Sequence, residues 1–153
     1  MFAQLAPLAL LGPLLAVATV TDLRHRLITN KLNAAVALLS PASWLLLGFG
    51  PWQVALILAL ALGVFLWFAL WFRFGQMGGG DVKLGAALVL WLRPSEVVLF
   101  LLATAVAGGV VTLATLVWHR RGKRSGAPET PYGLALVAGA LLIFTQRYLN
   151  HFA

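Results

Sequence analysis

Long apolar runs separated by short polar loops dominate this chain of 153 residues. Its residues are 61% hydrophobic and 10% charged, whereas soluble domains carry about 25% charged residues. Several runs reach or approach the ~20 residues that a helix needs to cross a hydrocarbon core. Backbone N–H and C=O groups find no water there, so a spanning segment must pair them internally, as a helix does. We therefore expect an all-α, polytopic membrane protein that forms one membrane-embedded domain, residues 1–153.

The apolar runs predict about six transmembrane helices. They cover residues 5–20, 34–49, 53–72, 84–92, 97–118 and 132–148. The fourth run is short, and its helix could begin inside the preceding glycine-rich segment. Pro41 is expected to kink the second helix. The first run has no positive charge before it, so we expect a spanning helix and not a cleaved signal peptide.

Basic residues are distributed unevenly between the predicted loops. The loops after the first, third and fifth spans hold nine of them: Arg24, Arg26, Lys31, Arg73, Lys83, Arg120, Arg121, Lys123 and Arg124. The opposite side holds Arg93 and Arg147. The positive-inside rule then places the loops with nine basic residues in the cytoplasm and both termini outside it. This topology accounts for the net charge of +7, so we expect a multi-pass protein of the cytoplasmic (inner) membrane and no nucleic-acid partner.

The chain has two aspartates, Asp22 and Asp81, and both fall at the cytoplasmic edge of a predicted span. Ionisable groups near membrane depth are costly and often functional. One interpretation is that each is an interfacial charge paired with a nearby base, such as Arg24 or Arg26 for Asp22 and Lys83 for Asp81. Two aspartates on one face favour aspartic proteolysis, in which one carboxylate takes a proton from water and a protonated partner polarises the scissile carbonyl.

Two nearby carboxyls share one proton because like charges drive their pKa values apart. Asp22 falls near the C-terminus of its predicted helix, where the helix dipole disfavours an anion, and Asp81 falls near an N-terminus, where it favours one. We therefore expect Asp81 to be the ionised base and Asp22 the proton donor in the resting state.

Three glycines, Gly78, Gly79 and Gly80, precede Asp81 directly. They carry no side chains to block a substrate backbone, and they permit dihedral angles that other residues avoid. An extended peptide can pair with such bare backbone as a strand would. The alternative interpretation is a flexible turn between helices. Other glycines, Gly108 and Gly109 in the fifth span and Gly133 and Gly139 in the sixth, are expected at helix-packing positions.

Other kinds of chemistry find little support in the sequence. The chain has no cysteine, which excludes disulfides, thiolate metal sites and cysteine nucleophiles. His25, His119 and His151 lack metal-ligand spacing, so we expect no metal and no other cofactor. The sequence contains neither a P-loop nor a GxSxG motif, and no serine has a polar base near it in sequence.

Three segments together resemble the type IV prepilin peptidase family, membrane aspartic proteases of the GxGD type. They are DLRHRLITNKLN at residues 22–33, GGGDVKLGAAL at 78–88 and PYGLALVAGAL at 131–141. The resemblance implies that Asp22 and Asp81 are the catalytic pair and that Gly78 and Gly80 are the motif glycines. It implies cleavage of the leader peptide of prepilins or pseudopilins at the cytoplasmic face, just before the hydrophobic segment of the pilin, without a metal.

The chain departs from the longer members of this family. Those members carry an N-terminal region with paired cysteines and also N-methylate the new terminus, so this cysteine-free chain resembles the short form found with Flp-type tight-adherence pili, without a soluble methyltransferase domain. Thr29 stands where the family usually has proline, which is expected to relax the turn before Asn30. We take Asn30 and Lys83, with the three glycines, as candidate substrate contacts.

Two alternatives to this function stay open. Archaeal preflagellin peptidases share the same pattern. A non-catalytic function, as a small transporter, a proton-conducting subunit or a structural subunit of a secretion complex, would use the aspartates as ion sites or not at all. No inverted repeat relates the two halves, and both acids fall at span edges, which argues against transport. The sequence does not predict an oligomeric state.

Overall fold

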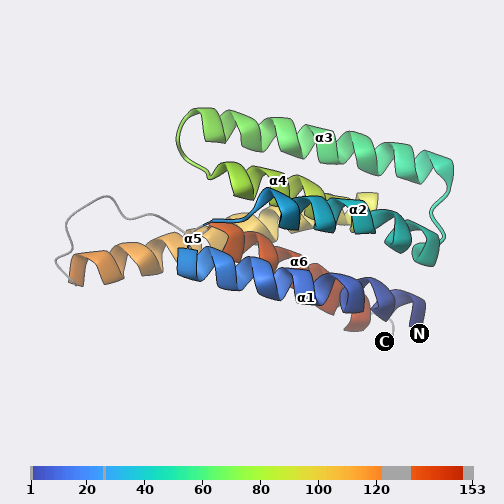
Figure 1. Ribbon diagram of the computed structural model, residues 1–153, viewed down its shortest axis with the longest axis horizontal. Helices are drawn as coiled ribbons and strands as arrows, with labels where there is room; N and C mark the ends of the chain where they lie inside the picture. The colour runs from blue at the N-terminus through green and yellow to red at the C-terminus, as the bar shows by residue number, and fades with distance from the viewer. Residues whose placement is uncertain (1, 26, 122–131, 150–153) are drawn as a thin grey trace.

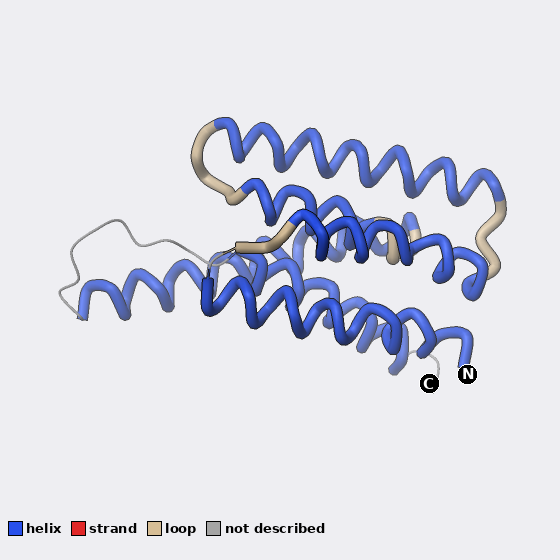
Figure 2. Tube along the Cα trace, in the orientation of Figure 1, coloured by secondary structure: helices blue, strands red, loops and turns tan. Residues whose placement is uncertain are grey.

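The protein, described by a computed structural model over residues 2–25, 27–121 and 132–149, is a bundle of six α-helices (Figures 1 and 2). The helices are α1 (Phe2–His25), α2 (Asn30–Leu47), α3 (Pro51–Arg73), α4 (Gly79–Val89), α5 (Val97–Arg121) and α6 (Tyr132–Leu149), with a 3-10 turn η1 (Pro94–Glu96) before α5. Each helix overlaps one of the predicted apolar runs, and no strand occurs in the described ranges. The all-α prediction is therefore confirmed.

Local sequence signals set where α2 ends and α3 begins. Gly48 adopts a left-handed conformation with φ 68°, which glycine tolerates and which commonly terminates a helix. Pro51 then starts α3 at the first helical position, where its missing N–H costs nothing. Within α2, Pro41 cannot donate to the carbonyl of Ala37, and the hydroxyl of Ser40 donates to that carbonyl instead, at 2.7 Å.

The shortest helix, α4, lies in the middle of the bundle against α2, α3 and α6. Its 11 residues correspond to about 16 Å at ~1.5 Å per residue, roughly half of a ~30 Å hydrocarbon core. Two indoles fix its C-terminal end to α2: Trp44 Nε1 donates to the carbonyl of Leu90 at 2.7 Å, and Trp91 Nε1 donates to that of Val36 at 2.8 Å. A helix that is anchored at one end in this way presents its other end, which carries Asp81, at a defined place.

The helices form two groups. In one, α2 and α3 pack against α4, and in the other, α1 and α5 pack against α6 (Figure 1). Contacts between α1 and α2 and between α4 and α6 join the groups. Helix α1 ends, and α4 and α6 begin, at the same end of the bundle, while the first residues of α1 and the last of α6 lie at the opposite end.

The expected helix-packing glycines divide into two kinds. A Cβ atom added at Gly139 would clash with the Thr104 hydroxyl and lie 3.4 Å from the carbonyl oxygen of Phe100, so this glycine does let α5 and α6 approach closely. A Cβ at Gly108 would make only ordinary contact, at 3.7 Å, and one at Gly109 would meet no atom within 4 Å. The packing prediction is therefore confirmed for Gly139 and wrong for Gly109, which faces open space.

Two helices in the described ranges are long and apolar enough to cross a membrane, Pro51–Arg73 and Pro94–Trp118, and a shorter apolar helix covers Tyr132–Arg147. Their outward faces carry large exposed apolar side chains, such as Leu66, Val106 and Trp118, as expected for surfaces that meet lipid. The chain therefore has the character of a membrane protein. The number of helices that cross, and the side on which the termini lie, stay predictions.

Candidate active site

Asp22 lies in the last turn of α1 and is almost fully buried, with 4% of its surface exposed. Its Oδ2 atom accepts a hydrogen bond from the backbone N–H of Leu134 at 3.0 Å. Leu134 is the third residue of α6, and the first N–H groups of a helix have no partner within it. The carboxylate of Asp22 therefore sits at the N-terminus of a second helix, whose positive dipole end favours its ionised form.

Asp81 is the third residue of α4 and has 8% of its surface exposed. Gly78 is the N-cap of this helix, and its backbone makes a hydrogen bond with the Asp81 carboxylate. This arrangement is one half of a capping box, in which the side chain three residues into a helix reaches back to the N-cap. The short helix thus turns the carboxyl of Asp81 towards its own first turn.

The two carboxyls interact electrostatically. Asp81 lies ahead of the apolar part of α4 and outside both helices long enough to span a membrane. Burial, first, and the negative charge of Asp22, second, raise the pKa of Asp81 from 3.8 to about 7, against the lowering effect of the hydrogen bond from Gly78. A pair of carboxyls in this situation shares one proton near neutral pH.

These surroundings favour Asp81 as the group that holds the shared proton, which is opposite to the assignment expected from the sequence. That expectation considered only the helix to which each aspartate belongs. The structure adds the N-terminus of α6, which supports an anion at Asp22. At Asp81, burial and the charge of Asp22 outweigh the hydrogen bond from Gly78 at the start of its own helix, so the pKa of Asp81 stays raised.

Gly133, the second residue of α6, makes room for the Asp22 carboxyl. A Cβ atom added at Gly133 would lie 2.7 Å from Asp22 Oδ2 and 2.7 Å from Ile28 Cδ1, closer than real side-chain atoms approach. Sequence reasoning took Gly133 for a helix-packing glycine and missed this role. The sequence did hold a signal for this role. Gly133 follows Tyr132 directly, at the start of a predicted helix and within the third segment that resembles the prepilin peptidase family.

The glycines before Asp81 serve close approach and not unusual dihedral angles. Gly78 has an ordinary φ of −71°, Gly79 and Gly80 belong to α4, and the described glycines with positive φ are Gly48 and Gly75. The fourth helix thus begins inside the glycine segment, as the sequence allowed, and the wider choice of dihedral angles that these glycines permit is not used. A Cβ at Gly78 would lie 2.8 Å from Asp81 Oδ2, and one at Gly80 would lie 2.9 Å from the carbonyl oxygen of Ile28; Gly79 packs against Phe72.

The other predicted contacts lie beside the pair and do not touch it. Lys83 Nζ donates to Asn30 Oδ1 at 2.7 Å, and both side chains are exposed. No ion pair joins Lys83 to Asp81 in the part of the chain that the structure describes, while Arg26, a predicted base for Asp22, lies outside it. Within the same part no three side chains of the metal-binding kinds His, Cys, Asp and Glu come together.

Thr29 keeps the backbone shape that a proline would impose. Its φ of −72° and ψ of 148° agree with the φ near −65° to which proline is locked. Its Oγ1 atom also accepts the N–H of Leu32 at 3.3 Å and caps α2. The turn before Asn30 is therefore set by a side-chain cap and is not relaxed as the sequence suggested.

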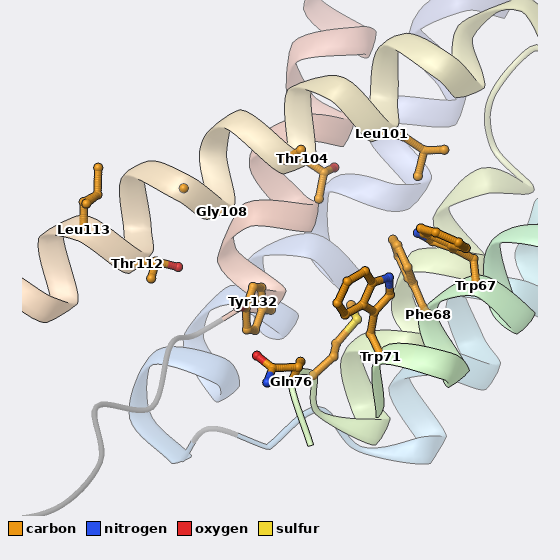
Figure 3. Close-up of a pocket in the computed structure, with 13 residues that line it drawn as sticks. Trp67, Phe68, Trp71, Gln76, Leu101, Thr104, Gly108, Thr112, Leu113 and Tyr132 are labelled. Carbon is orange, nitrogen blue, oxygen red and sulfur yellow. The ribbon is translucent and has the colours of Figure 1, made fainter. Parts of the chain in front are cut away.

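An apolar groove of about 630 Å³ runs between α3 and α5 and reaches the glycine segment (Figure 3). Its wall on α3 carries Trp67, Phe68 and Trp71, and its wall on α5 carries mostly small side chains and glycines between two leucines, Leu101 and Leu113. The α5 positions include Thr104, Ala105, Gly108, Gly109 and Thr112. Met77 and Tyr132 line the groove as well. They directly precede Gly78 and Gly133, the glycines that lie against the two carboxyls, so the lining of the groove extends to the residue before each of these glycines.

Comparison with known proteins identifies relatives of this site. The sequence model of the type IV leader peptidase family matches residues 9–113, which include both aspartates. The chain is 27% identical over 141 residues to the prepilin leader peptidase/N-methyltransferase of Bacillus subtilis (strain 168). The match covers 92% of this chain and 56% of that protein, so the chain spans about half the length of this relative. No solved structure matches the chain.

Substituting Gly133 is expected to disturb Asp22. In Gly133→Ala the added Cβ displaces the carboxyl, so the hydrogen bond to Leu134 N–H weakens and that amide exchanges faster with deuterium. Overpacking of this kind costs about 1–3 kcal/mol of stability. Gly108→Ala is the matched control, because its Cβ would have its nearest neighbour at 3.7 Å and alanine is the better helix former. Equal exchange at Leu134 in both variants would contradict the proposed contact.

The titration of Asp81 is expected to have its midpoint at about pH 7. Because the folded state holds this proton more tightly than the unfolded chain, the contribution of Asp81 to folding stability falls as pH rises from about 4 to about 7. Carboxyl NMR on aspartate-labelled protein follows two signals, since the chain has two aspartates. In Asp22→Asn the midpoint of the Asp81 titration should move to lower pH, because the negative charge of Asp22 is one of the two causes of the raised pKa and is removed. An Asp81 midpoint near 4, with Asp22 titrating near 7, would reverse the assignment.

Proposed function

Because the chain belongs to the type IV leader peptidase family, we propose that it is a membrane aspartic endopeptidase that removes leader peptides from prepilins or pseudopilins. The observation that carries the proposal is the pair of buried, electrostatically coupled carboxyls of Asp22 and Asp81 at one end of the bundle. The sequence match to a prepilin leader peptidase supports this substrate class.

In the proposed mechanism Asp22 acts as the base and Asp81 as the acid. Ionised Asp22 takes a proton from a water molecule while that water attacks the scissile carbonyl carbon. Protonated Asp81 gives its proton to the carbonyl oxygen, which produces a neutral tetrahedral gem-diol. The gem-diol then returns a proton to Asp81 as the carbonyl re-forms, and Asp22 gives its proton to the departing amine, so the pair ends as it began.

The arrangement of the helix ends supports a site at the cytoplasmic face of the inner membrane. Asp22 lies in the last turn of α1, against the start of α6, and Asp81 lies in the first turn of α4. These helix ends share one end of the bundle (Figure 1), and the basic loops after α1, α3 and α5 are predicted on this side. The positive-inside rule makes that side cytoplasmic. We propose a multi-pass protein with both termini on the opposite side and residues 1–153 forming one membrane-embedded peptidase domain.

The groove between α3 and α5 supports a substrate that is cleaved next to an apolar segment. Its lining is mostly apolar, and it lies between the two helices that qualify as membrane spans. Its lining includes Met77 and Tyr132, which precede the two glycines that lie against the carboxyls. We propose that a substrate helix lying in it presents the peptide bond just before that helix to Asp22 and Asp81. The bare backbone at Gly78 is exposed and is available to an extended leader.

A cleavage assay in membranes tests the proposed function directly. The chain is co-expressed with a prepilin from the same genome, and loss of the leader is followed by mass. Asp22→Asn and Asp81→Asn are both expected to abolish cleavage while still inserting, because each removes one half of the proton exchange. Cleavage by either variant would remove that aspartate from the pair. A proton-flux assay on the same membranes tests the alternative of a proton-conducting subunit.

Filling the groove is expected to weaken substrate binding without changing the chemical step. Gly109→Leu projects into the groove, since a Cβ at Gly109 meets no atom within 4 Å. KM should rise several-fold with kcat nearly unchanged, which is the pattern for loss of uniform binding. Gly63→Leu is the matched control on α3, because Gly63 is equally open and lies outside the groove lining. Equal KM values for the two variants would show that the groove does not hold the substrate.

A further inference from the structure

Asn33 is a buried amide whose nitrogen donates a hydrogen bond and whose oxygen accepts none. It lies in the first turns of α2, and 5% of its surface is exposed. Its Nδ2 atom donates to the carbonyl oxygen of Gly80 at 3.0 Å, and its Oδ1 atom is buried without a partner. A buried acceptor that is left unpaired costs about 1–3 kcal/mol. An apolar side chain of similar shape would avoid that cost, so stability alone does not account for an asparagine at this position.

The bond from Asn33 acts on the residue that precedes Asp81. Gly80 packs its Cα against the backbone of Ile28, so closely that an added Cβ would lie 2.9 Å from the Ile28 carbonyl oxygen. The side chain of Ile28, in turn, lies against Gly133, the glycine that contacts Asp22. Ile28 therefore lies between Gly80, which precedes Asp81, and Gly133, which contacts Asp22. The bond from Asn33 holds the first turn of α4 against Ile28.

We propose that Asn33 is a positioning residue, whose hydrogen bond to the Gly80 carbonyl holds the first turn of α4 against Ile28 and thereby sets the separation of the Asp22 and Asp81 carboxyls. Its effect on catalysis rests on the proposed peptidase function. Its effect on geometry does not, so the two are tested by separate measurements.

The geometric test uses the absence of cysteine from the chain. Asp22→Cys and Asp81→Cys are introduced together, and a short thiol–thiol reagent reports how often the two positions come close. Adding Asn33→Leu, which has a similar shape and cannot donate, is expected to lower the yield of cross-link several-fold. Asn33→Ala provides a second variant, in which the amide is removed without adding bulk.

Trp44→Phe is the matched control. Trp44 also joins α2 to α4 by a side-chain bond to a backbone carbonyl, that of Leu90, at 2.7 Å. This bond lies at the other end of α4 from Asp81. Trp44→Phe is therefore expected to lower stability but to leave the cross-link yield as it is in the parent, whereas Asn33→Leu should leave stability unchanged or higher and lower the yield.

The catalytic test follows prepilin cleavage by the single variants, with both aspartates in place. Asn33→Leu is expected to lower kcat about ten-fold, equivalent to about 1.4 kcal/mol of transition-state stabilisation, with little change in KM. Unchanged cross-linking in both Asn33 variants would overturn the proposal, whatever their activity. A lowered yield in a protein whose parent cleaves no prepilin would uphold the positioning function and remove the peptidase function.

Discussion

The meeting of the Asp22 carboxylate with the first turn of α6 is the contact on which the rest of the site depends. It brings together residues 112 positions apart in sequence, and it requires a glycine at position 133, because any side chain there would occupy the place of the carboxyl. Helix α4, which carries Asp81 in its first turn, packs against α6, with Gly85 of α4 close to Leu136 of α6. The second carboxyl therefore comes from a helix that neighbours the one that binds Asp22.

The same contact gives the two chemically identical side chains different properties. Both carboxyls are buried and each meets a backbone N–H at a helix N-terminus, Asp22 at Leu134 and Asp81 at Gly78, but burial and the charge of Asp22 together oppose the ionisation of Asp81. An aspartic pair needs this asymmetry, since one carboxyl must hold a proton while the other accepts one. The asymmetry arises from what each carboxyl meets in the folded bundle, because both belong to helices whose own dipoles favour the opposite arrangement.

Helix positions could be predicted from sequence because local residues determine them. The apolar runs predicted the helices, and the two aspartates were identified as the candidate site. Two features of the site were missed: the clearance at Gly133 and the proton preference of the pair. Each depends on which distant group lies a few ångströms away, and neither composition nor spacing contains that information.

The carboxyls stand on opposite sides of the seam between the two helix groups, Asp81 with α2, α3 and α4, and Asp22 with α1, α5 and α6 (Figure 1). The segment from Ile28 to Asn33 crosses this seam and contacts the surroundings of both. The groove between α3 and α5 opens along the same seam, with one wall on each group. An occupant of the groove therefore contacts both groups at once, so that binding and the alignment of the carboxyls depend on the same helix–helix arrangement. Under the proposed function, a site built across the seam in this way would couple the presence of a substrate helix to the separation of the two carboxyls.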